Sequence, residues 1–199
     1  MQVFFNGLWE AAFYIPAAIS VLVVRNLAMA FFVRRSDLHE AHFFEGATLN
    51  PLVRMDRVGF FFLAVGGAGW SKDPSPELER LRLSTRTIRR VIAAGPWLNL
   101  LAAGALAAMA ILFRPEPASY TARLLQAGAF MNIHMAILGM IPFPPFAYGR
   151  LMRGLEPGWA RHEVAGLTAV GIFFLFGAAR LFEPLDALLG AAMFPIPSV

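Results

Sequence analysis

The chain has 199 residues, of which 58% are hydrophobic and only 15% are charged, and it contains no cysteine. A soluble domain usually has about a quarter of its residues charged, so this composition excludes an ordinary soluble enzyme and predicts an integral membrane protein. The formal charge of +4 comes from basic residues in short segments beside apolar stretches, which excludes a solvated nucleic-acid-binding domain. The absence of cysteine excludes disulfides and thiolate metal sites.

Four apolar segments are long enough for membrane-spanning helices, because a bilayer core of about 30 Å requires about 20 helical residues. They cover roughly residues 9–33, 90–113, 119–141 and 162–182. A shorter apolar run at 58–70 (VGFFFLAVGGAGW) has glycines near its end, which favours a re-entrant or interfacial element over a full span. The apolar tail 183–199 is also short, and we expect it in the membrane interface. We therefore predict one all-α membrane domain over residues 1–199.

The basic residues predict the orientation of these helices. If segment 58–70 enters and leaves on one face, that face carries thirteen of the 17 lysine and arginine residues, against three on the other face. The positive-inside rule then places the richer face in the cytoplasm and the N-terminus outside. A full span at 58–70 would separate the basic segments 34–57 and 72–90, so the charge pattern favours re-entry. The last basic residue, Arg25, lies within the first apolar segment, where an arginine costs roughly 2.5–3.5 kcal/mol on insertion scales.

Four short motifs follow one another along the chain. They are GATLNPLVRMDRVG at 46–59, GWSKDPSP at 69–76, AAGPWLN at 93–99 and NIHMAILGMIPFPPFAYGR at 132–150. In this order and at this spacing they resemble the motifs of the bacterial site-2 protease family of intramembrane zinc metalloproteases, in its small-core branch. The resemblance covers about residues 15–155, so that the helix expected at 162–182 would be an addition to the family core.

The resemblance implies a zinc site that this chain has lost. Where the family has His-Glu-x-x-His in its first core helix, this chain has Arg25, Asn26 and Met29, and where the family has a third ligand, an aspartate, it has Ala147 and Tyr148. Arginine repels a cation, methionine is a poor zinc ligand, and asparagine cannot accept the proton of a zinc-bound water. We therefore expect no metal, no cofactor and no protease activity; the alternative is an active protease with a different ligand set. Arg25 would either extend toward the cytoplasmic face or pair inside the former active-site cavity.

The resemblance also implies a membrane-buried groove that receives a transmembrane helix of another protein. Two asparagines and three prolines are its candidate residues in this chain: Asn99, Asn132, Pro142, Pro144 and Pro145. The prolines remove backbone donors and break the helix, which leaves carbonyl groups in need of a partner. Small residues from Ala102 to Ala108 favour close helix approach, within the chain or to another subunit. We expect a multi-pass pseudoprotease of the bacterial inner membrane, a scaffold or accessory subunit whose partners are the lipid bilayer and other membrane-protein subunits, without nucleic acid.

His134 is a second candidate site, because it lies in the middle of the segment 119–141 and ionisable residues at membrane depth are rare. One interpretation is a packing role, with a hydrogen bond to Asn132 or Asn99. The other interpretation is an axial ligand for a tetrapyrrole, which would make the chain an accessory subunit of a respiratory or photosynthetic membrane complex.

Overall fold

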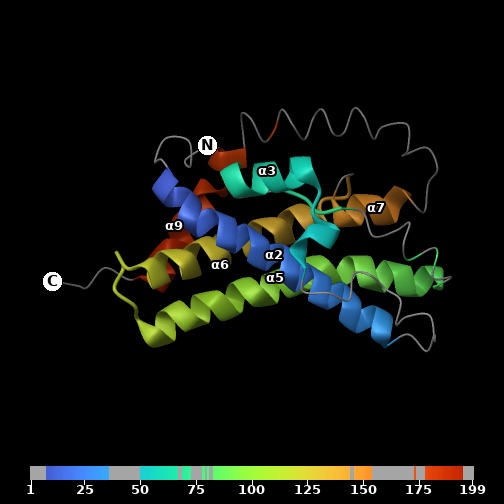
Figure 1. Cartoon of the computed structure of the whole chain (residues 1–199), viewed down its shortest axis with the longest axis horizontal. Helices are drawn as coiled ribbons and strands as arrows, with labels where there is room; N and C mark the ends of the chain where they lie inside the picture. Colours follow the sequence, from blue (N-terminus) through green and yellow to red (C-terminus); the bar gives the residue numbers. More distant parts are fainter. Residues whose placement is uncertain are drawn as a thin grey trace.

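The computed structural model describes residues 8–35, 50–66, 69–72, 78, 80, 83–143, 146–153, 173 and 178–194. Over these residues the chain forms helices and no β-strand, which confirms the all-α prediction. The elements are α2 (Leu8–Arg34), the 3-10 turn η2 (Pro51–Arg54), α3 (Arg57–Gly66), α5 (Thr85–Phe113), α6 (Tyr120–Met140), α7 (Ala147–Arg153) and α9 (Ala178–Met193) (Figure 1).

Three long helices, α2, α5 and α6, form the centre of the described structure. α5 packs most extensively against α6, and α2 crosses both of them (Figure 1). One apolar cluster joins α2, α3 and α6, and includes Phe13, Val21, Leu63 and Met131. A second cluster, around Met29, holds the C-terminal half of α2 against the first turns of α5. Separate apolar clusters therefore make up much of the interior of the bundle, and any polar side chain buried between them requires a specific explanation.

Side-chain caps determine where α5 and α6 begin. The Oγ atoms of Ser84 and Ser119 each accept a hydrogen bond, 3.2 Å long, from the backbone N–H three residues later. Each bond satisfies an N–H group that has no partner within the helix. The cap at Ser84 starts α5 at Thr85, five residues before the boundary predicted at 90, because the apolar pattern does not include the exposed basic first turns. Arg114 ends α5 in the left-handed conformation, with φ of 43°.

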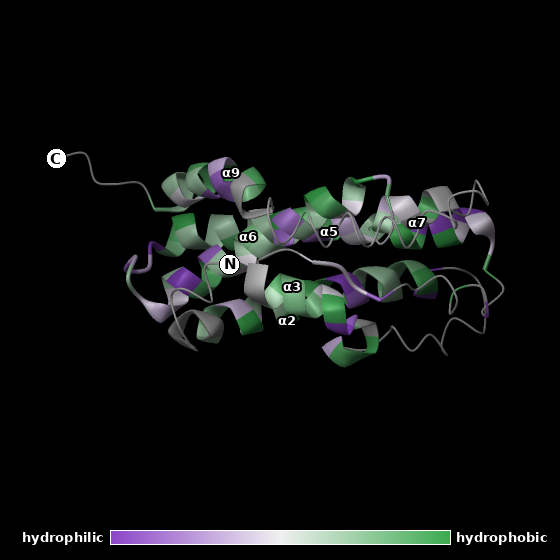
Figure 2. Cartoon of the chain, turned by 90° about the horizontal axis from the view of Figure 1, so that it is seen from above, coloured by the Kyte–Doolittle hydropathy of each residue, from purple (hydrophilic) through white to green (hydrophobic). Residues whose placement is uncertain are grey.

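Two described helices are long and apolar enough to cross a membrane, Ala12–Arg34 within α2 and Thr85–Phe113. Hydrophobic residues predominate along both, as Figure 2 shows. This agrees with a membrane protein. The predicted span 119–141 corresponds to α6, but α6 is not among the two because polar residues in its middle lower its hydropathy.

α9 differs from the prediction for the end of the chain. The predicted helix 162–182 lies largely outside the described residues, and α9 continues through the boundary predicted between 182 and 183. Pro184 lies inside this helix. The reason is tertiary packing, because Phe182 and Leu185 pack with Trp70 and Leu138, so the buried face of α9 extends past the proline.

The segment predicted to re-enter forms a short helix followed by a reversal of the chain. α3 has ten residues, or about 15 Å of helix, which is too short to cross a bilayer core. The Asp56 carboxylate accepts a hydrogen bond from the Gly59 N–H at 2.8 Å at the start of this helix. After α3 the chain returns, so that a β-carbon on Gly69 would collide with the backbone of Gly59 and with Leu63. The start and the end of the segment, at Gly59 and Gly69, therefore lie in contact.

Candidate functional site

Arg25 is buried in the middle of α2, with 4% of its surface exposed. Its side chain packs against α5, since a β-carbon on Gly95 would lie 3.5 Å from the Cγ, Nε and Cζ atoms of Arg25. The side chain thus stays within the helix bundle and does not extend to the C-terminal end of α2.

Arg25 lines a small cavity of about 10 Å³, which is room for about one water molecule. The other residues around this Arg25 cavity come from three separate parts of the chain: Gly69, Trp70, Ser71, Met135, Gly139, Phe146 and Ala147. Arg25 and Ala147, two positions that the sequence analysis assigned to the former metal site, therefore face the same small space. Met29 and Ala147 also belong to one apolar cluster, and Tyr148 is partly exposed at the start of α7.

Asn26 connects α2 to the first motif. Its side chain is fully buried, and its Nδ2–H donates a hydrogen bond of 3.1 Å to the backbone carbonyl of Asn50. The Asn50 side chain in turn accepts a hydrogen bond from the Leu52 N–H at 3.0 Å and caps η2. Asn26, which the resemblance aligns with a glutamate, therefore links two segments of the chain by a hydrogen bond.

The four motifs, distant in sequence, meet around Arg25. Asn50 of the first motif is bonded to the neighbour of Arg25, and Gly69 of the second motif lines the cavity. Gly95 of the third motif contacts the arginine, and Ala147 of the fourth lines the cavity. The third and fourth motifs also touch each other directly, because a β-carbon on Gly139 would lie 2.6 Å from the Pro96 Cγ.

The donor set at this place does not suit zinc. Arg25 has a positive charge, the Asn26 Nδ2–H donates a hydrogen bond to the Asn50 carbonyl, and Met29 is buried in an apolar cluster. A catalytic zinc site needs three nitrogen, sulfur or carboxylate ligands and an open position for water. In the part of the chain that the structure describes, no three histidine, cysteine or acidic side chains are grouped so as to hold a metal.

The candidate groove residues lie in different environments. Asn99 and Asn132 are fully buried inside the helix bundle, so neither lines an open groove. The Asn132 Nδ2–H donates a hydrogen bond of 2.8 Å to the Gly128 carbonyl, whereas the Asn99 amide has no hydrogen-bond partner within the described residues. Pro142 is exposed just after α6, and Pro144 and Pro145 lie outside the described residues.

His134 is held by α9 and is not hydrogen-bonded to Asn132 or Asn99, the two partners expected for it. Its Nε2 atom lies 2.7 Å from the Asp186 Oδ1, and its ring stacks on Phe182 with the ring centroids 4.0 Å apart. Ligation of a metal through Nε2 would therefore require α9 to move. Asp186 was not predicted as a site residue from the sequence, although an acid in a largely apolar tail is a signal that could have identified it.

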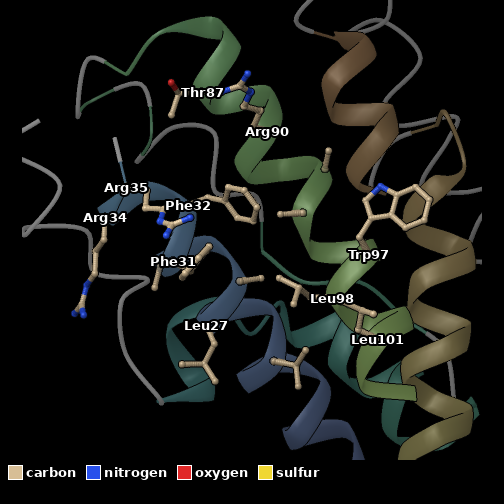
Figure 3. Close-up of a pocket in the computed structure, with 15 residues that line it drawn as sticks. Leu27, Phe31, Phe32, Arg34, Arg35, Thr87, Arg90, Trp97, Leu98 and Leu101 are labelled. Atoms are coloured by element: carbon tan, nitrogen blue, oxygen red, sulfur yellow. The ribbon is translucent and has the colours of Figure 1, made fainter. Parts of the chain in front are cut away.

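A much larger open groove runs between α2 and α5, with a volume of about 1,370 Å³ (Figure 3). We call its most apolar part the apolar wall, formed by Leu27, Phe31, Trp97, Leu98 and Leu101. We call the opposite part the basic end, formed by Arg34, Arg35, Thr87 and Arg90. The basic end lies where α2 ends and α5 begins, so both helices contribute cations at one level of the bundle (Figure 3). Sequence analysis did not identify this groove, because it arises from the crossing of two helices.

The surroundings of Arg25 thus explain the polar residues in α2 in terms of packing, and the groove between α2 and α5 is much larger than the cavity beside Arg25. No protein-family model matches the chain, and no curated protein or solved structure is significantly similar to it.

Proposed function

We propose that this protein is a catalytically degenerate member of the site-2 protease-like family, and that it acts as a non-enzymatic scaffold or accessory subunit in the bacterial inner membrane. The observation that carries the proposal is the convergence of the four motifs on Arg25. The motifs are separated by up to about a hundred residues along the chain, yet each contributes a residue near Arg25. This meeting supports a common core built by the four motifs, as the resemblance implies. In this chain the core surrounds an arginine instead of a metal.

Arg25 takes over part of the structural role of the lost metal in this proposal. A guanidinium keeps a positive charge at the centre of the bundle, and its stem fills the space beside Gly95. The cavity that remains holds about one water molecule, which is too little for a metal, its water and a peptide bond. The core therefore supports assembly and not hydrolysis.

α5 provides the surface on which a partner's transmembrane helix would dock. Gly104 and Ala108 are exposed and four residues apart, and a β-carbon on Gly104 would meet nothing within 4 Å. Leu101 and Leu112 flank them and are also exposed. Small residues at this spacing let two helix backbones approach closely in a membrane, while the flanking leucines pack against the partner.

Metal analysis of the protein purified in mild detergent tests the loss of catalysis. We expect zinc far below one ion per chain, and no zinc-dependent cleavage of membrane substrates. Stoichiometric zinc that disappears in Arg25→Ala or Met29→Ala would contradict the proposal. A visible absorption spectrum from the same preparation tests the alternative function, because a scaffold without pigment is colourless, whereas a tetrapyrrole band lost in His134→Ala would favour the accessory subunit with a cofactor.

A paired substitution tests the docking surface on α5. Gly104→Leu with Ala108→Leu enlarges the face and should reduce the amount of partner subunits that remain bound after solubilisation of the native membrane. Ala12→Leu, at an exposed small residue of α2, is the matched control and should leave this amount unchanged. Equal retention of partners by the double variant and the control would show that the face is covered only by lipid.

A further inference from the structure

We propose that the groove between α2 and α5 binds one anionic phospholipid, with its phosphate at the basic end and its acyl chains along the apolar wall. The groove shares Leu101 with the helix-docking face of α5 and is otherwise lined by other residues, and the inference does not depend on the loss of protease activity. It rests on the charge, length and exposure of the residues that line the groove.

The basic end has a net positive charge that no described residue neutralises. Within the described part of the chain, none of Arg34, Arg35 and Arg90 has an acidic partner. The Arg35 guanidinium lies 4.9 Å from the centre of the Phe31 ring, at the junction of the basic end and the apolar wall. Arginine donates several hydrogen bonds in a geometry that matches phosphate oxygens. The Thr87 hydroxyl, which shares a hydrogen bond of 2.9 Å with the Ser84 hydroxyl, also lines this end. An anion is therefore the ligand group that complements this end.

The length of the groove matches one leaflet of a bilayer. Thr87 at the basic end and Leu101 on the apolar wall are fourteen residues apart on α5, which is about 21 Å of helix. Half of a bilayer with its headgroups is also about 20–22 Å thick. The volume of about 1,370 Å³ exceeds the roughly 300–1,000 Å³ of most small-molecule pockets, as a two-chain amphiphile would require.

The order of side chains along the groove distinguishes a lipid from a helix as the occupant. Cations lie at one end only, and below them the groove becomes apolar, in the order of a phospholipid from phosphate to acyl chain. Trp97 and Phe31 are each about half exposed, so the apolar wall is open to the bilayer. A partner's apolar helix would leave the three arginines without an anion.

The test is the retention of lipid by the full chain during purification. The protein is reconstituted with phosphatidylglycerol and phosphatidylcholine in equal amounts, solubilised, and examined by native mass spectrometry. The test variant is Arg35→Ala with Arg90→Ala. Its matched control is Arg86→Ala with Arg89→Ala, which removes two positive charges at the same end of the bundle, from exposed residues of α5 that do not line the groove.

We expect the wild-type chain to retain one phosphatidylglycerol in preference to phosphatidylcholine. The test variant should bind it about 10- to 30-fold more weakly, as expected for two arginines near an anionic headgroup, with the control unchanged. Arg35→Lys with Arg90→Lys keeps the charge and should recover most of the binding, which excludes misfolding as the cause. Equal retention of both lipids, an equal loss in the control, or a bound protein that the test variant releases would overturn the proposal.

Discussion

Replacing Gly139 with alanine tests the close approach of α5 and α6 beside the Arg25 cavity. The new β-carbon would lie 2.6 Å from the Cγ and 3.1 Å from the Cβ of Pro96, and a proline ring cannot rotate away. Overpacking of this kind typically costs about 1–3 kcal/mol. Alanine gains at most about 0.5–1 kcal/mol over glycine in a helix, and less here because Gly139 is next to the last residue of α6. We expect a net loss of about 1–2 kcal/mol in the free energy of unfolding.

Gly104→Ala is the matched control. Gly104 is an exposed residue of α5, and nothing lies within 4 Å of a β-carbon at this position. It should gain about 0.5–1 kcal/mol from helix propensity alone. Unfolding of both variants in detergent, followed by tryptophan fluorescence, gives the two values. The double variant Pro96→Ala with Gly139→Ala removes the proline Cγ and should recover most of the loss. The reasoning is refuted if Gly139→Ala is as stable as the wild-type chain while Gly104→Ala shows its gain.

Three further predictions concern single side chains. Asp186→Ala removes the hydrogen bond to His134, which is worth about 1.5–3 kcal/mol for a charged partner, and should increase hydrogen exchange over residues 178–193 of α9. Glu183→Ala, at an exposed acid of the same helix, is the control and should leave this exchange unchanged. Equal exchange in the two variants would contradict the role of Asp186. Asn99→Leu should raise the free energy of unfolding by about 1–2 kcal/mol, because it removes a buried amide without a partner among the described residues; lower stability would reveal a bond that the amide makes. Arg114→Gly should raise it by about 1 kcal/mol in thermal unfolding, because φ is 43° there, and no gain would mean that the cation at the end of α5 matters more.

The helices α2 and α6 were predictable from the sequence because each is largely apolar along its whole length, so that the apolar run and the helix have nearly the same ends. The predicted spans 9–33 and 119–141 agree with Leu8–Arg34 and Tyr120–Met140 within one residue. The start of α5 was not predictable from hydropathy, since its first turns are basic and a serine cap determines them. α9 was misjudged at its boundary because packing against α6 carries the helix through Pro184.

The position of Arg25 among the motifs was accessible from the sequence only through their order and spacing. Its burial against Gly95 depends on the angle between α2 and α5, which no local pattern contains. The bond between His134 and Asp186 joins residues 52 positions apart and was missed for the same reason. The groove between α2 and α5 also depends on the crossing of the helices, although each of its arginines was visible as a topological signal.

The burial of Arg25 has a consequence for the order of events during synthesis. α2 is synthesised before the segments that surround its arginine. The neighbouring residues Gly69, Gly95 and Ala147 leave the ribosome later. If α2 enters the membrane as it is made, it carries a charge that costs roughly 2.5–3.5 kcal/mol until those segments arrive. The first helix is then held only weakly in the bilayer by itself, and its final placement requires the helices that follow. A ribosome-bound chain that ends before residue 95 should therefore be extracted from membranes more easily than the complete protein.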